Sequence, residues 1–238
     1  MTQLFGEVAA LYDEVRPGYP DGVREMILDY AGSPASIVEL GAGTGKGTEV
    51  LVGLGKPLTA LEPDPRMAAV LRAKFPQITI ETTTFEAWTP YGETGLISCA
   101  SAWHWMDAAT RNRRAFDLLA PGGVMTIFQH KYAYVDPEQD RAISEVLAAV
   151  DRRVPVRGER WVLEDVREAG LWNDVEERLI TTYPVFEKQR YLDLTQTFSP
   201  FRRHHPDVQR RLLDDLSAAL TGPVALELRT SVVLSRKR

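Results

Sequence analysis

Residues 37–48 carry the residue types and spacing that could bind a small charged ligand. The segment is typical of a buried strand that turns sharply into a helix, with the pattern Glu39-x-Gly41-x-Gly43-x-Gly45 at the turn. Glycines allow positive φ angles and a close approach of a ligand to the backbone, and a helix start offers free N–H groups. An acidic side chain at the strand end would repel a pyrophosphate and attract an ammonium. We therefore expect a ligand with a cationic group on this loop.

Two common nucleotide-binding patterns fit this loop poorly. A phosphate-binding P-loop requires Gly-x-x-x-x-Gly-Lys followed by Ser or Thr, but Leu40 stands five residues before Gly45, and Gly47 follows Lys46. A dinucleotide fingerprint requires Gly-x-Gly-x-x-Gly, but Lys46 occupies the place of its third glycine. The P-loop pattern fails at two positions, and a nicotinamide dinucleotide is the weaker alternative.

A second carboxylate, Glu62, ends the next predicted strand, 17 residues after Gly45. Its two oxygens can accept hydrogen bonds from both hydroxyls of a ribose, as an acid near this position does in dinucleotide-binding folds. The alternative is that Glu62, ahead of Pro63, Asp64 and Pro65, only favours the next helix through the helix dipole. Its place at the strand end, in register with the glycine loop, favours the ribose role.

Alternating strands and helices must position these residues. From residue 36 onward, short β-rich runs alternate with longer helical patterns, which is typical of βαβ units. The predicted strands are residues 36–40, 58–62, 78–82, 96–100, 124–129, 175–185 and 224–234. The predicted helices among the first five strands are residues 45–54, 65–75 and 107–119. We expect an α/β fold with a mostly parallel seven-stranded sheet, helices on both faces and an antiparallel last strand.

Further helices are predicted on both sides of this core. Residues 4–15 and 21–30 precede it, and helical insertions at 137–151, 161–169, 188–197 and 207–220 occur late in the chain. No linker separates two domains, so we expect a single domain over residues 1–238. It would consist of an N-terminal helical cap (1–35), a cofactor-binding core (36–130) and substrate-side helices with the final strands (131–238). The polar ending, residues 235–238, is predicted to be a frayed tail.

The composition restricts partners and compartment. The 238 residues carry a net charge of −5, and residues 1–100 hold 7 basic and 13 acidic groups, which disfavours nucleic acid as the main partner. The single Cys99 excludes an internal disulfide and a cysteine zinc site. No apolar run reaches the roughly 18 residues of a membrane span, and the opening is unlike a signal peptide. A cytoplasmic protein is expected.

Three segments resemble the class I S-adenosylmethionine-dependent methyltransferases. They are the glycine loop with Glu39, the strand end Ala60-Leu61-Glu62-Pro63-Asp64, and the opening Phe5-x-x-Val8-Ala9-x-x-Tyr12-Asp13-x-x-Arg16-Pro17-Gly18-Tyr19-Pro20. The opening is similar to that of the ubiquinone-biosynthesis-like and trans-aconitate-like group. The resemblance implies a Rossmann-like fold, S-adenosylmethionine as cofactor, and methyl transfer to a small-molecule acceptor by in-line displacement without a metal. A monomer or homodimer is expected.

The same resemblance implies contacts with the cofactor. The residues concerned would be Arg16, Glu39, Gly41, Ala42, Gly43, Gly45, Glu62, Pro63, Thr84, Phe85 and Ser101. Arg16 would pair with the methionine carboxylate, with a surface ion pair to Asp13 or Glu14 as the alternative. Thr84 stands where the family frequently has Asp, and Phe85 would either flank the adenine or belong to the core.

Roles on the acceptor side follow from the ends of the fourth and fifth predicted strands. Tyr19, Trp103 and His130 would contact the acceptor, although one of Trp103 and Trp105 is expected to pack under the following helix. His104 would act as a general base or orienting group, because a neutral imidazole suits proton transfer near neutral pH. A structural hydrogen bond is the alternative for His104, and a carboxylate acceptor would need no base.

Two other functions stay open at this point. The chain could bind S-adenosylmethionine without turnover, as a sensor or assembly factor. It could also be a nicotinamide-dependent oxidoreductase, which Lys46 at the third glycine position disfavours. The sequence does not identify the methyl acceptor.

Overall fold

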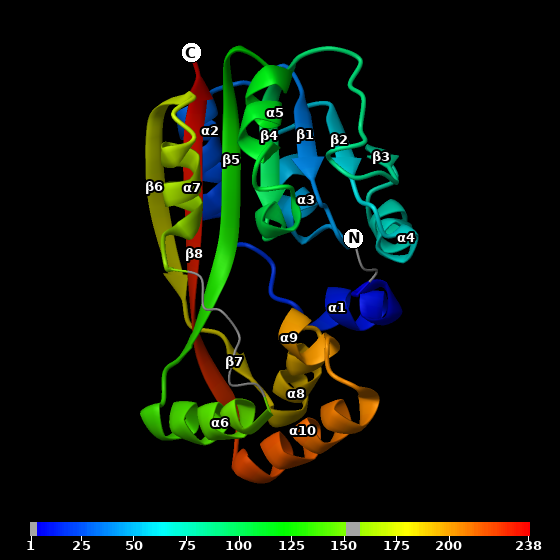
Figure 1. Cartoon of the computed structure of the whole chain (residues 1–238), viewed down its shortest axis with the longest axis vertical. Coiled ribbons are helices and arrows are strands. Elements are labelled where there is room, and N and C mark those ends of the chain that lie inside the picture. The colour runs from blue at the N-terminus through cyan, green and yellow to red at the C-terminus, as the bar shows by residue number, and fades with distance from the viewer. Residues whose placement is uncertain (1–3, 151–157) are drawn as a thin grey trace.

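One mixed β-sheet runs through the centre of the computed structural model, which describes residues 4–150 and 158–238 (Figure 1). Its strand order is β3-β2-β1-β4-β5-β8-β6, and β7 pairs with β8 beside this path. The strands are β1 (Ile37–Leu40), β2 (Leu58–Leu61), β3 (Thr79–Glu81), β4 (Thr94–Ala100), β5 (Leu119–Tyr134), β6 (Trp172–Thr182), β7 (Val185–Phe186) and β8 (Val224–Lys237). The strands β1 to β5 pair in parallel, whereas β8 is antiparallel to β5 and β6. The predicted fold class is confirmed, with the short β7 as an addition.

The strand order reverses between β1 and β4, and this reversal fixes where a ligand can bind. Leu40, the last residue of β1, lies beside Leu61 of β2 and Cys99 of β4. The segments that follow these three strands therefore leave the sheet at the same edge. In open α/β sheets, ligands bind beyond the carboxyl ends of the strands at such a switch point.

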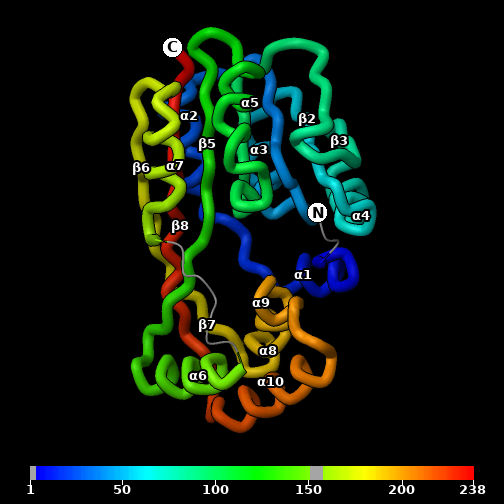
Figure 2. Tube along the Cα trace, in the orientation of Figure 1, coloured from blue at the N-terminus to red at the C-terminus, as the bar shows by residue number. Residues whose placement is uncertain are grey.

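Helices cover both faces of the sheet (Figure 2). Helices α2 (Gly22–Ala31) and α3 (Lys46–Val52) share an apolar cluster with one face, and α5 (Arg111–Leu118) and α7 (Trp161–Glu168) share another with the opposite face. Helix α4 (Pro65–Lys74) connects β2 with β3. The central strands are thus buried on both faces, which accounts for their nearly continuous apolar runs.

Strands β5 and β8 are longer than the sequence predicts. The predicted strand 124–129 extends to residues 119–134, because Leu119 pairs with Thr94 of β4 and β8 pairs with β5 as far as Tyr134. The prediction of a frayed tail over 235–238 was wrong, since β8 continues to Lys237 and the buried Ser235 pairs with Met125. The extension of β5 to Tyr134 and the paired end of β8 have one cause: each pairs with a strand that is far away in the sequence.

Beyond the sheet, β5 and β8 reach a helical layer with its own apolar cluster (Figure 1). It is formed by α6 (Pro137–Val150), α8 (Lys188–Gln196), α9 (Ser199–Arg202) and α10 (Pro206–Ala219). Residue 151, at the predicted end of α6, lies outside the described residues. A short 3₁₀ helix η1 (Gly6–Val8) and α1 (Ala9–Val15) lie between this layer and the sheet, in contact with α4 and α8. No helix in the described ranges has the length and apolarity to cross a membrane.

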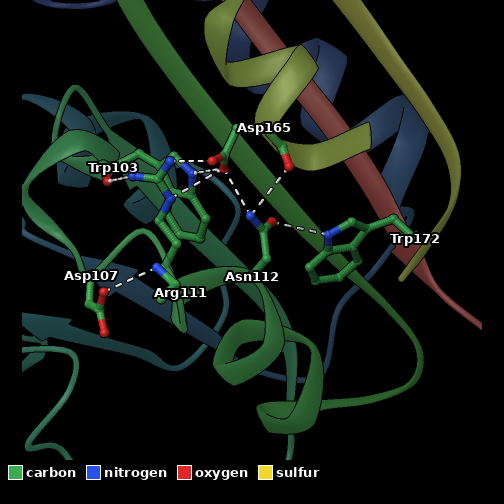
Figure 3. A network of polar contacts seen from close by, with 7 residues as sticks. Trp103, Asp107, Arg111, Asn112, Asp165 and Trp172 are labelled. Carbon is green, nitrogen blue, oxygen red and sulfur yellow. Dashed lines mark hydrogen bonds and ion pairs between the residues drawn. The ribbon is translucent and has the colours of Figure 1, made fainter. Parts of the chain in front are cut away.

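A buried polar network fastens α7 to α5 (Figure 3). The Asp165 carboxylate accepts hydrogen bonds from Trp103 Nε1 at 2.8 Å and Asn112 Nδ2 at 2.9 Å, and it forms an ion pair with Arg111. The side-chain oxygen of Asn112, Oδ1, accepts a hydrogen bond from Trp172 Nε1 at 3.2 Å. One carboxylate therefore holds the segment after β4, α5 and α7 in a fixed arrangement.

Replacing Asp165 with Ala should lower the free energy of unfolding by about 3 kcal/mol, because Arg111 would remain buried without its counter-ion. The Arg111 side chain is only 7% exposed. The matched control is Asp117→Ala on α5, whose ion pair with Arg113 is exposed, and it should cost less than about 0.5 kcal/mol. Urea denaturation measures both variants, and equal losses would contradict the structural importance of the network.

Candidate functional site

A cavity of about 290 Å³ lies at the carboxyl edge of the sheet, where the strand order reverses. We refer to it as the larger cavity. Segments that follow β1, β2, β3 and β4 form its walls, and the N-terminal segment closes it. Its lining residues are Leu4, Phe5, Tyr12, Gly41, Gly43, Glu62, Pro63, Asp64, Met67, Thr83, Thr84, Phe85, Glu86, Ala100, Ser101, Ala102, Trp105 and Met106. The predicted positions in the glycine loop, after β2, after β3 and after β4 thus meet in one space.

A smaller cavity of about 60 Å³ adjoins the larger one. The two share Tyr12, Gly41, Gly43, Ala100 and Ser101 in their walls. The other residues that line the smaller cavity are Arg16, Pro17, Tyr19, Ala42, Thr44, Lys46, Gly47, His130 and Tyr132. A ligand could therefore extend from one cavity into the other past the ends of β1 and β4.

Gly43 and Gly45 have different structural roles in the loop. Gly43 has φ of +60°, lines both cavities, and an added β-carbon would meet only Met67 Cε at 3.6 Å. Gly45 is not among the lining residues of either cavity, and a β-carbon there would lie 2.5 Å from Phe75 and 2.8 Å from Leu71. Gly43 therefore leaves space for a ligand, whereas Gly45 lets the loop pack against α4.

Glu62 presents a largely buried carboxylate to the larger cavity. It is 7% exposed, and its two oxygens accept hydrogen bonds from the backbone N–H groups of Gly43 and Asp64, each at 2.8 Å. Burial raises the pKa of Glu62, against the effect of these two bonds. Each oxygen still has a lone pair for a further donor, so Glu62 could accept hydrogen bonds from a diol.

Glu39 lies behind the loop and is fully buried. Its Oε2 accepts a hydrogen bond from Thr48 Oγ1 at 2.6 Å, whereas Oε1 has no partner among the described residues. The pKa of Glu39 is raised to about 8, chiefly by burial. The hydrogen bond from Thr48 lowers this pKa in part, and the negative charge of Glu62 raises it further. A β-carbon on Gly47 would lie 2.5 Å from Oε1, so the unpartnered oxygen is directly behind the wall of the smaller cavity. A cation bound near that wall would lower the pKa of Glu39 and favour its charged form.

Tyr19, Ser101 and His130 form one side of the smaller cavity. The hydroxyls of Tyr19 and Ser101 are 2.8 Å apart, and the Tyr19 ring stacks on the His130 ring with centroids 4.3 Å apart. Ser101 has φ of +54°, a conformation that non-glycine residues adopt mainly where tertiary structure imposes it. Burial raises the pKa of Tyr19 well above its ordinary range, so the phenol stays protonated.

Both ring nitrogens of His130 have partners. Nε2 lies 3.1 Å from the Gly18 carbonyl oxygen, which can only accept, so Nε2 donates there. Nδ1 lies 2.9 Å from Thr230 Oγ1 and accepts from it. The pKa of His130 is lowered to about 4, chiefly by burial. The hydrogen bond to Gly18 raises this pKa in part, and the positive charge of Arg16 lowers it further. His130 is therefore a neutral group that fixes the Gly18 segment to the sheet.

Arg16 lines the smaller cavity but is held by the helical layer. Its Nε donates to Thr197 Oγ1 at 2.8 Å and one terminal nitrogen donates to the Thr197 carbonyl at 2.7 Å. Its guanidinium carbon lies 4.2 Å from the Phe198 ring centroid. The surface ion pair weighed as the alternative is not formed in the structure. Arg16 instead caps the end of α8 and ties the N-terminal segment to it.

One of the two tryptophans after β4 is buried, as expected, but it is Trp103, the one expected to contact the acceptor, and Trp103 lines neither cavity. Trp103 is 1% exposed and donates to Asp165 under α7, whereas Trp105 lines the larger cavity. His104 lies between them in the short helix η2 (Trp103–Trp105) and is not among the lining residues of either cavity. Its ring contacts the Trp105 ring, with centroids 4.6 Å apart. The segment thus directs one aromatic ring to the cavity and one into the core.

Thr84 and Phe85 both line the larger cavity. Thr84 Oγ1 accepts a hydrogen bond from the Ala87 N–H at 3.2 Å, and Phe85 is 4% exposed. Arg114 donates to the Phe85 carbonyl at 2.8 Å and holds this turn against α5. Phe85 therefore belongs to the core, as one of the two alternatives expected, and also forms part of the cavity wall.

Several lining residues were not predicted. The apolar ones are Leu4, Phe5, Met67, Trp105 and Met106, and the polar ones include Thr44 and Lys46. Lys46 directly follows the last glycine of the loop, so the loop pattern itself was the available signal. Phe5 begins the opening motif, but only the chain path over the sheet edge brings its ring to 6.0 Å from the Trp105 ring.

The buried neutral His130 should make stability depend on pH. Its folded pKa of about 4 lies below the ordinary value of 6.5, so the unfolded chain binds the proton first and stability is lost as pH falls from about 6.5 to about 4. The His130→Asn variant should reduce this loss by up to about 3 kcal/mol in denaturation at a series of pH values. The control is His205→Asn, which replaces an exposed histidine that lines neither cavity. Parallel profiles for His130→Asn and wild type would contradict the assignment.

Comparisons with known proteins match this geometry. A family model described as a methyltransferase domain matches residues 12–175. An uncharacterised methyltransferase of Mycobacterium tuberculosis is 36% identical over 124 residues, which are 52% of this chain and 50% of that protein. The trans-aconitate 2-methyltransferase of Rhizobium meliloti is 28% identical over 123 residues, 50% of this chain and 48% of that protein. The chain thus spans about half the length of the curated relatives it matches.

Solved structures share the fold at low sequence identity. A candidate type II methyltransferase from Anaeromyxobacter dehalogenans has a TM-score of 0.71 at 18% identity, over 93% of this chain and 97% of that chain. A phosphoethanolamine N-methyltransferase of Haemonchus contortus in complex with S-adenosyl-L-methionine has a TM-score of 0.59 at 12% identity, over 99% of this chain and 58% of that chain. Since the family model covers well over half of the sequence, this chain belongs to the methyltransferase domain family.

Proposed function

We propose that this protein is an S-adenosylmethionine-dependent methyltransferase that acts on a small-molecule acceptor by in-line displacement. The observation that carries the proposal is the largely buried Glu62 carboxylate beside Gly43, at the point where the larger cavity adjoins the smaller one. Membership of the methyltransferase domain family supports the same reaction. The proposal includes a monomer or homodimer in the cytoplasm that does not act mainly on nucleic acid.

The residues present fit this cofactor. Glu62 would accept hydrogen bonds from the ribose hydroxyls, and Thr84, Phe85 and Met106 offer a largely apolar wall for the adenine. The open space at Gly43 lets a ligand pass close to the backbone. The unpartnered Glu39 Oε1 behind the loop favours a positively charged amino group nearby. The methionine arm would therefore extend from the larger cavity into the smaller one.

For methyl transfer, the protein mainly needs to align the acceptor with the methyl group and to exclude water. When bound, S-adenosylmethionine supplies a methyl group activated by its sulfonium charge. Orientation alone can contribute roughly 7–11 kcal/mol to such a displacement. Phe5, Tyr12 and Trp105 close the cavity toward solvent, with Phe5 in ring contact with each of the other two. These aromatic faces are also suited to a cationic sulfur.

The methyl acceptor would need a group that is nucleophilic without help from a general base of the protein. Among the described residues that line the smaller cavity, no carboxylate is present, His130 has both nitrogens engaged, and Tyr19 stays protonated. His104, the base expected from the sequence, is not a lining residue of either cavity. A carboxylate acceptor meets this condition. Two matched relatives are named trans-aconitate 2-methyltransferases, and trans-aconitate is a carboxylic acid.

The proposal is tested with S-adenosylmethionine carrying an isotopic label in the methyl group and a panel of small carboxylic acids. We expect the label in a product that mild base hydrolyses, together with release of S-adenosylhomocysteine, because the acceptor oxygen would form an ester. Tight binding of S-adenosylmethionine without transfer to the acid panel or to a mixed metabolite extract would indicate a binding protein. Binding of NAD in place of S-adenosylmethionine would indicate an oxidoreductase.

Replacing Glu62 with Ala should weaken binding of S-adenosylhomocysteine by about 1–3 kcal/mol, because the ribose hydroxyls lose their acceptor. Isothermal titration calorimetry measures the change. The control is Glu81→Ala, a carboxylate at the end of the adjacent strand β3 that lines neither cavity. Since Glu62 also holds two loop N–H groups, the wild type is titrated in parallel with the 2′-deoxy analogue. Equal affinity for the ribose and deoxyribose ligands would contradict the role of Glu62.

A further inference from the structure

Two residues that line the smaller cavity carry polar groups that the proposed function has not used. One is the ammonium of Lys46, the first residue of α3, and the other is the hydroxyl of Thr44 in the loop before it. Thr44 is 1% exposed, and its Oγ1 has no hydrogen-bond partner among the described residues. A buried hydroxyl without a partner is uncommon in proteins and calls for a ligand or water at that place.

Lys46 differs from the other cations near the glycine loop. Arg16 is held by Thr197, and Lys74 forms an ion pair with Asp13 at 2.6 Å. No described residue accepts a hydrogen bond from Lys46 or forms an ion pair with it within 4.0 Å. Burial lowers the pKa of Lys46. The negative charge of Asp13 raises this pKa, but by less than burial lowers it. The ammonium is therefore half-buried at a cost that its surroundings do not offset.

The position of Lys46 is also unfavourable for its own helix. A cation in the first turn opposes the helix dipole, so helix stability does not explain a lysine there. No Asp or Glu is among the described residues that line the smaller cavity. An anionic ligand group in this cavity would thus lie near a cation and a buried hydroxyl that have no partner among the described residues, with no carboxylate among the lining residues to repel it.

We infer that Lys46 and Thr44 bind the carboxylate of the amino-acid arm of the cofactor. The inference rests on the proposed function and gives the arm a partner other than Arg16, which α8 already holds. Thr44 directly follows Gly43, and Gly43 is shared by both cavities, so the two groups lie on the path from the nucleoside to the smaller cavity. The unpartnered oxygen of Glu39 lies behind the same wall. The ammonium of a zwitterionic amino acid near Glu39 would favour the charged carboxylate, while its carboxylate would meet the Lys46 ammonium.

The same arrangement leaves a different place for the acceptor. Tyr19, His130 and Tyr132 line the smaller cavity from the N-terminal segment and β5, whereas Thr44 and Lys46 line it from the glycine loop and α3. If Lys46 bound the acceptor instead, its replacement would change the Michaelis constant of the acceptor and leave cofactor affinity unchanged. Binding measurements without acceptor therefore separate the two assignments.

The test is isothermal titration calorimetry with two probes, S-adenosylhomocysteine and its decarboxylated analogue, which keeps the amine. We expect the wild type to bind the complete molecule more tightly, and Lys46→Met to weaken it by about 10-fold to 100-fold while the affinity for the analogue changes little. Lys46→Arg should restore part of the difference because it keeps the charge. Thr44→Val, which preserves the side-chain shape, should weaken the complete molecule by about 3-fold to 10-fold.

Lys74→Met is the matched control, because it removes a nearby cation that lines neither cavity. It should change the affinities for both probes by the same small factor. Equal weakening of both probes by Lys46→Met, or no change in either, would overturn the inference. Equal affinity of the wild type for the two probes would do so without any variant. If the wild type binds neither probe, the proposed function itself fails, which is a different result from a failure at Lys46 alone.

Discussion

The site depends on the parallel pairing of β1 with both β2 and β4. Because Leu40 is in register with Leu61 and Cys99, the segments that follow three separate strands begin at the same edge of the sheet. This register places the glycine loop, the Glu62 carboxylate and Ser101 around one space. A one-residue slip of β1 would move the loop along the edge and turn its side chains to the other face. The apolar clusters on both faces prevent such a slip.

The second constraint is the N-terminal segment, which joins the sheet to the helical layer. Asp13 pairs with Lys74 of α4, Arg16 binds Thr197 at the end of α8, and Tyr19 reaches Ser101 after β4. The path of the segment closes both cavities with aromatic side chains. Its partners come from three distant parts of the chain, so the cavity is complete only when the whole fold has formed. The segment therefore couples the shape of the ligand site to the position of the helical layer.

Acidic and basic side chains line different cavities of the site. The carboxylates of Glu62, Asp64 and Glu86 line only the larger cavity, whereas the cations of Arg16 and Lys46 line only the smaller one. The buried Glu39 stands behind the wall of the smaller cavity, next to Gly47. In the proposed reaction, this distribution orients a cofactor whose hydroxyls and carboxylate lie at opposite ends. Catalysis would then rest on alignment and exclusion of water, since the described residues around the smaller cavity offer no free base.

The sequence by itself determined the fold class, the succession of strands and helices, and the positions of the glycine loop and Glu62. These features are local, because turn residues, apolar runs and strand-end acids act within a few residues of the chain. Only the tertiary structure decided the lengths of β5 and β8, the burial of Ser235 and the division of work between Trp103 and Trp105. It alone showed that Arg16 is held by α8, whereas Lys46 has no hydrogen-bond or ion-pair partner among the described residues. The physical reason is that pairing, burial and charge compensation depend on residues far apart in the sequence, and their positions are set only when the sheet and the helical layer come together.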